Sequence, residues 1–142
     1  MAIKQLSVFV ENKQGKLADL VKVLSNAGIN IRALSIADTK DFGILRLIVS
    51  DVDKIKEVLK DDYIAVVTDV VAAKMSDEAG SLSNILEILD KDGVNIEYMY
   101  AFTSSSNNGA YVVIRVDNNE EAEKVLSSSG IETLAEEDMK QI

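Results

Sequence analysis

The sequence predicts an α+β fold made of two similar units in tandem, about residues 1–68 and 69–142. Three observations lead to this prediction. The 142 residues are 47% hydrophobic and 27% charged, which is typical of a globular chain. A shift of 65 residues places Leu17 on Leu82 and Gly15 on Gly80, so the chain repeats itself. Stretches with strand periodicity and with helix periodicity alternate in the same order in both halves.

The first strand and helix of each unit are the clearest elements. Residues 3–10 alternate between apolar and polar side chains, which is typical of a strand. Residues 17–24 place Leu20 and Leu24 on one apolar stripe, which predicts a helix. Gly28 follows at the point where a helix C-terminus favours a residue with positive φ.

Four further elements complete the unit. Residues 30–37 and 43–49 are rich in β-formers and are joined by a short polar turn, which predicts a hairpin. Residues 52–59 have helical spacing, and residues 63–67 form a last strand. The order βαββαβ is that of a ferredoxin-like unit. We expect the two units to pack side by side as an eight-stranded antiparallel sheet with the helices on one face.

The junction and the second strands suggest how the units are used. Residues 66–71 lead from one predicted strand into the next without a linker, and the chain has no Pro. Apolar side chains occupy both phases of the second strand, as at Leu34 and Ile36 against Ile31 and Ala33. A sheet with one face in water alternates more cleanly, and a core of about 70 residues is thin. We therefore expect a homodimer or a larger oligomer.

Two shorter features are also expected. Residues 104–106 are predicted to be the hairpin turn of the second unit, and residues 136–142 a short C-terminal turn of helix.

The charge distribution excludes several classes of partner. Lys and Arg number 15 and Asp and Glu 24, so the net charge is −9. Residues 1–71 hold 10 basic and 10 acidic residues, whereas residues 72–142 hold 5 and 14. Nucleic acid and anionic membranes attract basic surfaces, so neither is an expected partner. No apolar run reaches the roughly 18 residues of a membrane span, and the N-terminus lacks a signal peptide, so a cytoplasmic location is expected.

Missing residue types limit the chemistry. The chain has no Cys and no His, which removes thiolate and imidazole chemistry, and no metal or cofactor is expected. We expect a protein that is not an enzyme.

The strongest motif lies between the first strand and the first helix. Residues 8–17 combine a strand ending in Glu-Asn with a glycine before an apolar helix, and Gly-Ile-Asn-Ile follows at residues 28–31. Residues 75–82 and 93–96 repeat the pattern. In both halves the sequence resembles an ACT domain, a small regulatory module that binds amino acids. The resemblance covers nearly the whole chain and implies a stand-alone tandem ACT protein.

The motif suits a zwitterionic ligand on physical grounds. A helix N-terminus presents unpaired N–H groups that attract a carboxylate, and a glycine lets the ligand come close. An Asn amide offers a donor and an acceptor. The expected ligand-binding residues are Glu11, Asn12, Gln14, Gly15, Lys16, Leu17 and Asn30 in the first unit, and Asp77, Ala79, Gly80, Ser81, Leu82 and Asn95 in the second.

The resemblance also implies that each site lies between two domains. The loop of one domain faces the second strand of its neighbour, so Asn12 and Gly15 would share a site with Asn95. Asp77 and Gly80 would share one with Asn30. Asp77 replaces the amide of Asn12 and would repel a carboxylate, so the site with Asn12 is the more competent.

Structural roles remain open for several of these residues. The two glycines could serve to shape the turns without contacting a ligand. Asn30 and Asn95 could likewise serve to bridge backbone groups. The loops also lack the Pro common before the glycine, and Val10 and Met75 stand where some members have His. The resemblance therefore implies a regulatory protein that binds an amino acid and signals to a partner enzyme or through its oligomeric state. The alternative is an interaction or oligomerisation module that binds no ligand.

Overall fold

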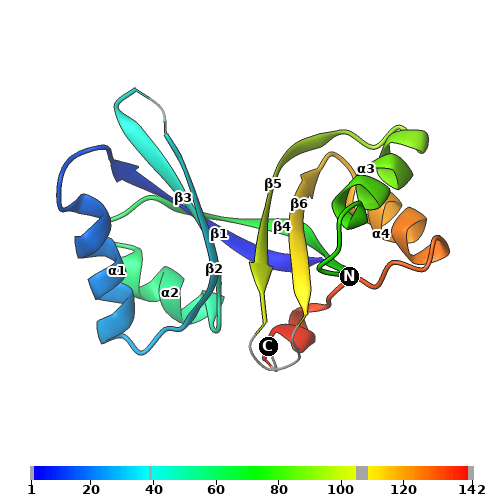
Figure 1. Cartoon of the computed structure of the whole chain (residues 1–142). Coiled ribbons are helices and arrows are strands. Elements are labelled where there is room, and N and C mark those ends of the chain that lie inside the picture. The colour runs from blue at the N-terminus through cyan, green and yellow to red at the C-terminus, as the bar shows by residue number, and fades with distance from the viewer. Residues whose placement is uncertain (1, 39, 105–108, 141–142) are drawn as a thin grey trace. The chain divides into compact units, whose positions relative to one another are not determined.

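A computed structural model describes residues 2–38, 40–104 and 109–140 (Figure 1). The chain divides into two compact units, which are described separately. The N-terminal unit comprises Lys4–Thr68, and the C-terminal unit comprises Met1–Ile3 with Asp69–Ile142.

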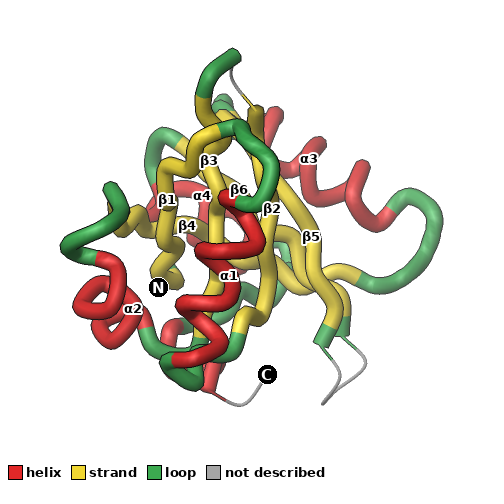
Figure 2. Tube along the Cα trace, turned by 90° about the vertical axis from the view of Figure 1, so that its left-hand side faces the viewer, coloured by secondary structure: helices red, strands yellow, loops and turns green. Residues whose placement is uncertain are grey.

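The N-terminal unit has the predicted βαββαβ order. Its strands neighbour one another in the order β2-β3-β1-β4, and the pairs β1–β3 and β2–β3 are antiparallel. Helices α1 and α2 lie on the same face of these strands (Figures 1 and 2). The elements are β1 (Ile3–Glu11), α1 (Lys16–Asn26), β2 (Ile31–Asp38), β3 (Phe42–Val49), α2 (Val52–Leu59) and β4 (Ala65–Met75), and β4 continues into the C-terminal unit.

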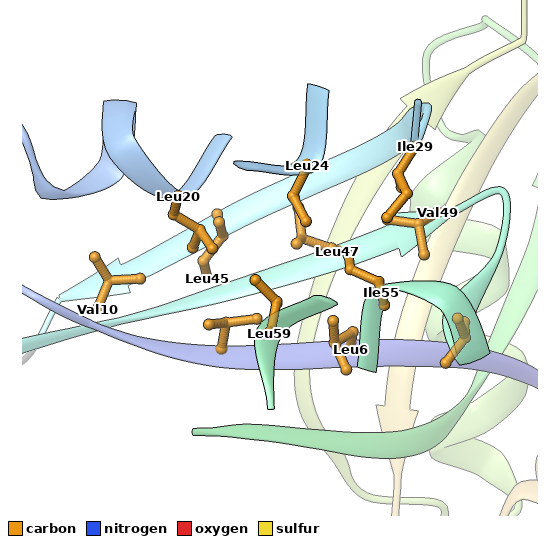
Figure 3. Close-up of a cluster of buried hydrophobic side chains, with 12 residues drawn as sticks. Leu6, Val10, Leu20, Leu24, Ile29, Leu45, Leu47, Val49, Ile55 and Leu59 are labelled. Atoms are coloured by element: carbon orange, nitrogen blue, oxygen red, sulfur yellow. The ribbon is translucent and has the colours of Figure 1, made fainter. Parts of the chain in front are cut away.

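The core of the N-terminal unit follows from the two periodicities. Leu20 and Leu24, four residues apart on α1, point toward Leu45 and Leu47 of β3 (Figure 3). All four side chains are 1% exposed or less. The predicted apolar stripe of the first helix is therefore the stripe that covers the sheet.

The C-terminal unit repeats this arrangement from β4 onward. Its strands neighbour one another in the order β4-β6-β5, and both pairs are antiparallel. Ile85 and Leu89 of α3 pack with Val112 and Ile114 of β6 in its core. Its elements after β4 are α3 (Ser81–Lys91), β5 (Ile96–Thr103), β6 (Ala110–Val116), α4 (Asn119–Ser128) and the 3₁₀ helix Glu136–Lys140.

The expected eight strands are wrong, because the described residues form six. Two predicted strands, one ending the first unit and one starting the second, are the single strand β4, which runs unbroken because no turn residue interrupts Ala65–Met75. The last predicted strand is reduced to one bridge between Ala73 and Thr133. Two hydrogen bonds flank this bridge, from the Lys74 amide to the Glu132 carbonyl (2.8 Å) and from the Leu134 amide to the Ala72 carbonyl (2.9 Å).

The chain leaves the sheet directly after this bridge. The Ala135 amide donates to the Asp138 carboxylate at 2.7 Å, which starts the 3₁₀ helix in place of a longer strand. This helix occupies the predicted C-terminal turn, whose expected end at Ile142 lies outside the described residues. The hairpin turn predicted at residues 104–106 lies largely outside them as well.

Candidate functional site

Two loops in equivalent places lead from a strand into a helix, residues 12–15 before α1 and residues 76–80 before α3 (Figure 1). Each ends in a glycine with left-handed backbone, Gly15 with φ 85° and Gly80 with φ 92°. A Cβ atom at either position would meet nothing within 4 Å. The backbone conformation therefore requires glycine, and the space beside each helix start is open.

The starts of α1 and α3 differ from those of the other two α-helices. Asp51 caps α2 by accepting from the Lys54 amide at 3.0 Å, and Asn118 caps α4 by accepting from the Glu121 amide at 3.1 Å. The helices that follow Gly15 and Gly80 have no side-chain cap. Their first-turn N–H groups, apart from the first of each helix, are thus available to an anion from outside the unit.

Backbone carbonyls in each loop take up one amide of the following helix. The Lys16 amide donates to the Lys13 carbonyl, and the Ser81 amide to the Glu78 carbonyl, both at 3.2 Å. The two loops are therefore closed in the same way, as the repeat predicts.

The loop of the N-terminal unit carries a fixed pair of charges. The Lys13 ammonium lies 3.1 Å from the Glu11 carboxylate, and both side chains are well exposed. The hydrogen bond from Lys13, its positive charge and the charge of Lys16 hold the pKa of Glu11 below its ordinary value. The Glu11 carboxylate is therefore already paired with Lys13. The Lys16 ammonium is available to a ligand anion.

Glu11 and Lys16 lie together in a cavity of about 290 Å³. Its other walls come from β1, the start of β3 and the segment before β4, and are formed by Phe9, Val10, Phe42, Asp62, Tyr63 and Ile64.

Asn12 sits outside this cavity, at the turn of the same loop. Its backbone amide donates to the Asp41 carbonyl at 3.1 Å, which holds the residue in place. Its side chain is exposed, and among the described residues it has no hydrogen-bond partner. Gln14 is exposed too, and Leu17 is 40% exposed although it lies on a helix. The amide of Asn12 is thus positioned by its backbone and free to contact a ligand.

The loop of the C-terminal unit has a different chemistry. Asp77 lines a cavity of about 610 Å³. Met75, Phe102 and residues 103–104, where β5 ends, line the same cavity. The Ser76 and Ser81 hydroxyls lie 2.6 Å apart and tie the loop to the first turn of α3. Ala79 and Gly80 are exposed, and Leu82 lines a separate cavity along the outer side of α3.

The structure does not bring Asn30 and Asn12 together within one unit. Asn30 follows the C-terminal end of α1, whereas Asn12 precedes its start, and 11 helical residues span about 16 Å. The Asn30 amide donates to the Ser50 hydroxyl at 3.2 Å, and the Ser50 amide donates to the Asn30 carbonyl at 3.0 Å. These bonds use only backbone atoms of Asn30, so the role of its side chain stays a prediction, and Asn95 is exposed at the equivalent place.

Sequence reasoning missed the aromatic walls of the two loop cavities. Phe9 lies on β1 at a position that alternation predicts to be polar and exposed. A large apolar residue at such a position was the sequence signal that could have revealed this wall. Phe102 stacks on Tyr111 with ring centroids 5.2 Å apart. Val10 and Met75, the residues that replace the histidine of some ACT domains, both line these cavities.

The described part of the chain contains no group of three or more acidic side chains placed to hold a metal ion. None of its helices is long and apolar enough to cross a membrane.

Comparisons with known proteins identify the family. The family model of the ACT domain pair matches residues 1–142. The crystal structure of protein BT0572 from Bacteroides thetaiotaomicron is similar at 44% identity, with a TM-score of 0.91 over 100% of this chain and 98% of that one. No curated protein matches the chain.

Two further solved structures share the fold at low identity. The ligand-free regulatory subunit of aspartate kinase from Thermus thermophilus is 14% identical, with a TM-score of 0.62 over 91% of this chain and 93% of that one. The regulatory subunit of aspartate kinase from Thermus flavus is 15% identical, with a TM-score of 0.59 over 92% and 94%. Together with the two glycine-started helices and the repeated order of helices and strands, the family match shows that the chain belongs to the ACT domain family, as an ACT domain pair.

Proposed function

We propose that the chain is a regulatory protein that binds a small amino acid at the N-termini of α1 and α3. The observation that carries the proposal is the contrast among the four α-helices. Asp51 and Asn118 cap α2 and α4, whereas α1 and α3 begin at Gly15 and Gly80 without a side-chain cap. A ligand carboxylate would take the place of the missing cap, because it is an anion with acceptors for the free N–H groups.

The residues around each helix start supply the other contacts. At α1, the Asn12 amide can donate to the carboxylate, and the Lys16 ammonium adds a positive charge near it. Asn95 from the second strand of the neighbouring domain is proposed to complete this site, and Asn30 the site at α3. The helix length supports this arrangement, because Asn30 is too far from Asn12 to reach the same amino acid within one unit.

The two sites are proposed to differ in strength. Asp77 stands in the loop before α3, where a carboxylate repels a ligand carboxylate and can instead hold an ammonium group. The excess of acidic residues in the C-terminal half adds to this repulsion. We therefore place the tighter amino-acid site at α1.

The regulatory role rests on the family. It also rests on the kind of site proposed, because binding an amino acid at a helix N-terminus needs no catalytic residue. ACT domains are regulatory modules, and two structures with this fold are regulatory subunits of aspartate kinase. We propose that this chain likewise acts on a partner enzyme of amino-acid metabolism or through its own homodimer, in the cytoplasm. The second candidate, a docking module without a ligand, is favoured by the absence of Pro from the loops, which leaves them less preorganised.

A thermal-shift screen of the full chain against the common amino acids tests the proposal. Binding to the folded state raises Tm in proportion to the logarithm of ligand concentration, so a true ligand shifts Tm progressively over a dilution series. The decarboxylated amine of the best ligand is the matched control and should give no shift. If no amino acid shifts Tm and calorimetry shows no heat of binding, the docking module is the better account.

A further inference from the structure

We propose that the amino acid bound at α1 has an aromatic side chain, and that this side chain lies in the cavity of about 290 Å³ beside Phe9 and Phe42. Lys16 holds the carboxylate of this ligand, and Asp62 holds its ammonium group. The inference rests on the proposed amino-acid site and names the class of ligand that the site takes. All residues that line the cavity belong to the N-terminal unit.

The apolar walls of the cavity lie side by side on three strands. Val8 and Val10 of β1 are buried in the core, so the alternation of the strand places Phe9 on the face away from the helices. Phe42 of the neighbouring strand β3 is on the same face, as the pairing of β1 with β3 shows. The Phe9 amide donates to the Ile64 carbonyl at 3.0 Å, so the segment leading into β4 lies along the other side of Phe9.

These walls are large apolar side chains that the chain itself leaves open to water. Phe9 is 40% exposed, Phe42 is 49% exposed and Ile64 is 69% exposed. Apolar side chains gathered in the open are typical of a binding surface. A ligand ring would remove them from water, and pairing of aromatic rings adds to the gain from burial alone.

The size of the cavity limits the ligand to a small one. Ligand pockets have volumes of about 300–1,000 Å³, and the cavity beside Phe9 is at the lower end of this range. This space suits one ring system together with the backbone of a single amino acid.

The charges around the cavity match a zwitterion. Glu11 is paired with Lys13 at 3.1 Å, whereas neither Lys16 nor Asp62 forms an ion pair among the described residues. The cavity therefore offers one available charge of each sign. The Asp62 amide donates to the Leu59 carbonyl at 3.2 Å, which fixes the backbone that carries the carboxylate. A ligand with a carboxylate and an ammonium group satisfies both charges, whereas a simple anion meets two carboxylates.

The C-terminal unit shows that the fold does not require these residues. The shift of 65 residues places Lys74 at the position of Phe9, and Lys74 is paired with Glu132 at 3.4 Å. The same shift places Ser81 at the position of Lys16. Because the same strand and helix form with Lys and Ser, an exposed Phe9 and the Lys16 ammonium are better explained by a ligand than by folding. The aromatic ligand is accordingly assigned to the N-terminal unit.

Calorimetric titration of the full chain with L-phenylalanine, L-leucine and L-alanine tests the ligand class. Burying the ring is expected to make the Kd of phenylalanine at least about tenfold lower than that of alanine. Contact between aromatic rings is expected to make it at least about twofold lower than that of leucine.

Phe9→Thr tests whether the ring lies in this cavity. Threonine favours a strand and leaves the core side of β1 unchanged, so the variant should fold. It is expected to raise the Kd of phenylalanine at least about tenfold and to leave the Kd of alanine unchanged. Val66→Thr is the matched control, because Val66 is 50% exposed and does not line the cavity, and it should change neither Kd.

Lys16→Ser tests the contact with the ligand backbone by placing in α1 the residue that begins α3. It is expected to raise the Kd of phenylalanine and of alanine alike, by about tenfold. Lys22→Ser, at an exposed lysine further along α1, is the matched control and should change neither Kd.

The outcomes separate this inference from the proposed function. If phenylalanine binds no more tightly than alanine, or if Phe9→Thr leaves the Kd of phenylalanine unchanged, the aromatic ligand in this cavity is wrong and the amino-acid site stands. If none of the common amino acids binds the unmodified chain, both proposals are wrong.

Discussion

Replacing Asn12 by Ala probes the proposed amino-acid site where the structure leaves the fewest other roles. The Asn12 side chain has no hydrogen-bond partner among the described residues, and its backbone is held by the Asp41 carbonyl, so the variant should fold normally. A hydrogen bond to a charged ligand group contributes about 1.5–3 kcal/mol. Because the loop is exposed and water can replace the amide, we expect the lower end, about 1.5 kcal/mol, or roughly a tenfold rise in Kd.

Replacing Asp77 by Asn is the companion experiment at the second loop. Removing a carboxylate from the cavity beside Met75 and Phe102 should leave binding unchanged or strengthen it, because the repulsion of the ligand carboxylate is lost. Asn26→Ala, an exposed amide at the far end of α1, is the matched control and should have no effect.

Calorimetric titration of the three variants measures Kd directly. Our reasoning is refuted if Asn12→Ala leaves the Kd of the amino acid unchanged and Asp77→Asn abolishes binding. That result would mean that the ligand is held through its ammonium group in the C-terminal unit.

Four stability predictions follow from individual contacts. Gly15→Ala should lower the free energy of unfolding by about 1–2 kcal/mol in urea titration, because a Cβ is strained at φ 85° although nothing crowds it. Asp51→Ala should cost about 1 kcal/mol in the same assay, because the Lys54 amide loses its cap. Leu24→Ala should cost about 2–5 kcal/mol, because the side chain is fully buried, and a cost below about 1 kcal/mol would contradict the packing. The hydrogen bond to the Asp92 carboxyl and the charge beside it raise the pKa of Glu121, so the folded state holds the proton more tightly and stability falls as pH rises through the raised pKa. Glu121→Gln should therefore raise Tm at about pH 7 and leave it unchanged at about pH 4.

The sequence predicted most of the fold because its signals are local and repeated. Leu20 and Leu24 at helical spacing, and glycines at matching places in both halves, identify the helices and their ends without long-range information. The number of strands was wrong for a physical reason that periodicity cannot reveal. An apolar run such as Ala65–Met75 has the same pattern whether it forms one strand or two, and pairing partners decide which.

The candidate site was predictable in type and less so in extent. The glycine before each helix identified the open N-termini, but the contrast with Asp51 and Asn118 became evident only in the hydrogen bonds. The cavities beside the loops depend on residues far apart in the chain, such as Phe9 and Phe42, which meet through strand pairing. A single sequence carries no signal for such long-range contacts.

Calorimetric titration of the full chain with the amino acid that gives the largest thermal shift, and with the same compound lacking its carboxylate, tests the central claim most directly. If the uncapped starts of α1 and α3 are carboxylate sites, the amino acid should bind and the amine should give no heat beyond dilution. Equal binding of the two compounds would contradict the claim, because the helix N-termini would then contribute nothing to recognition.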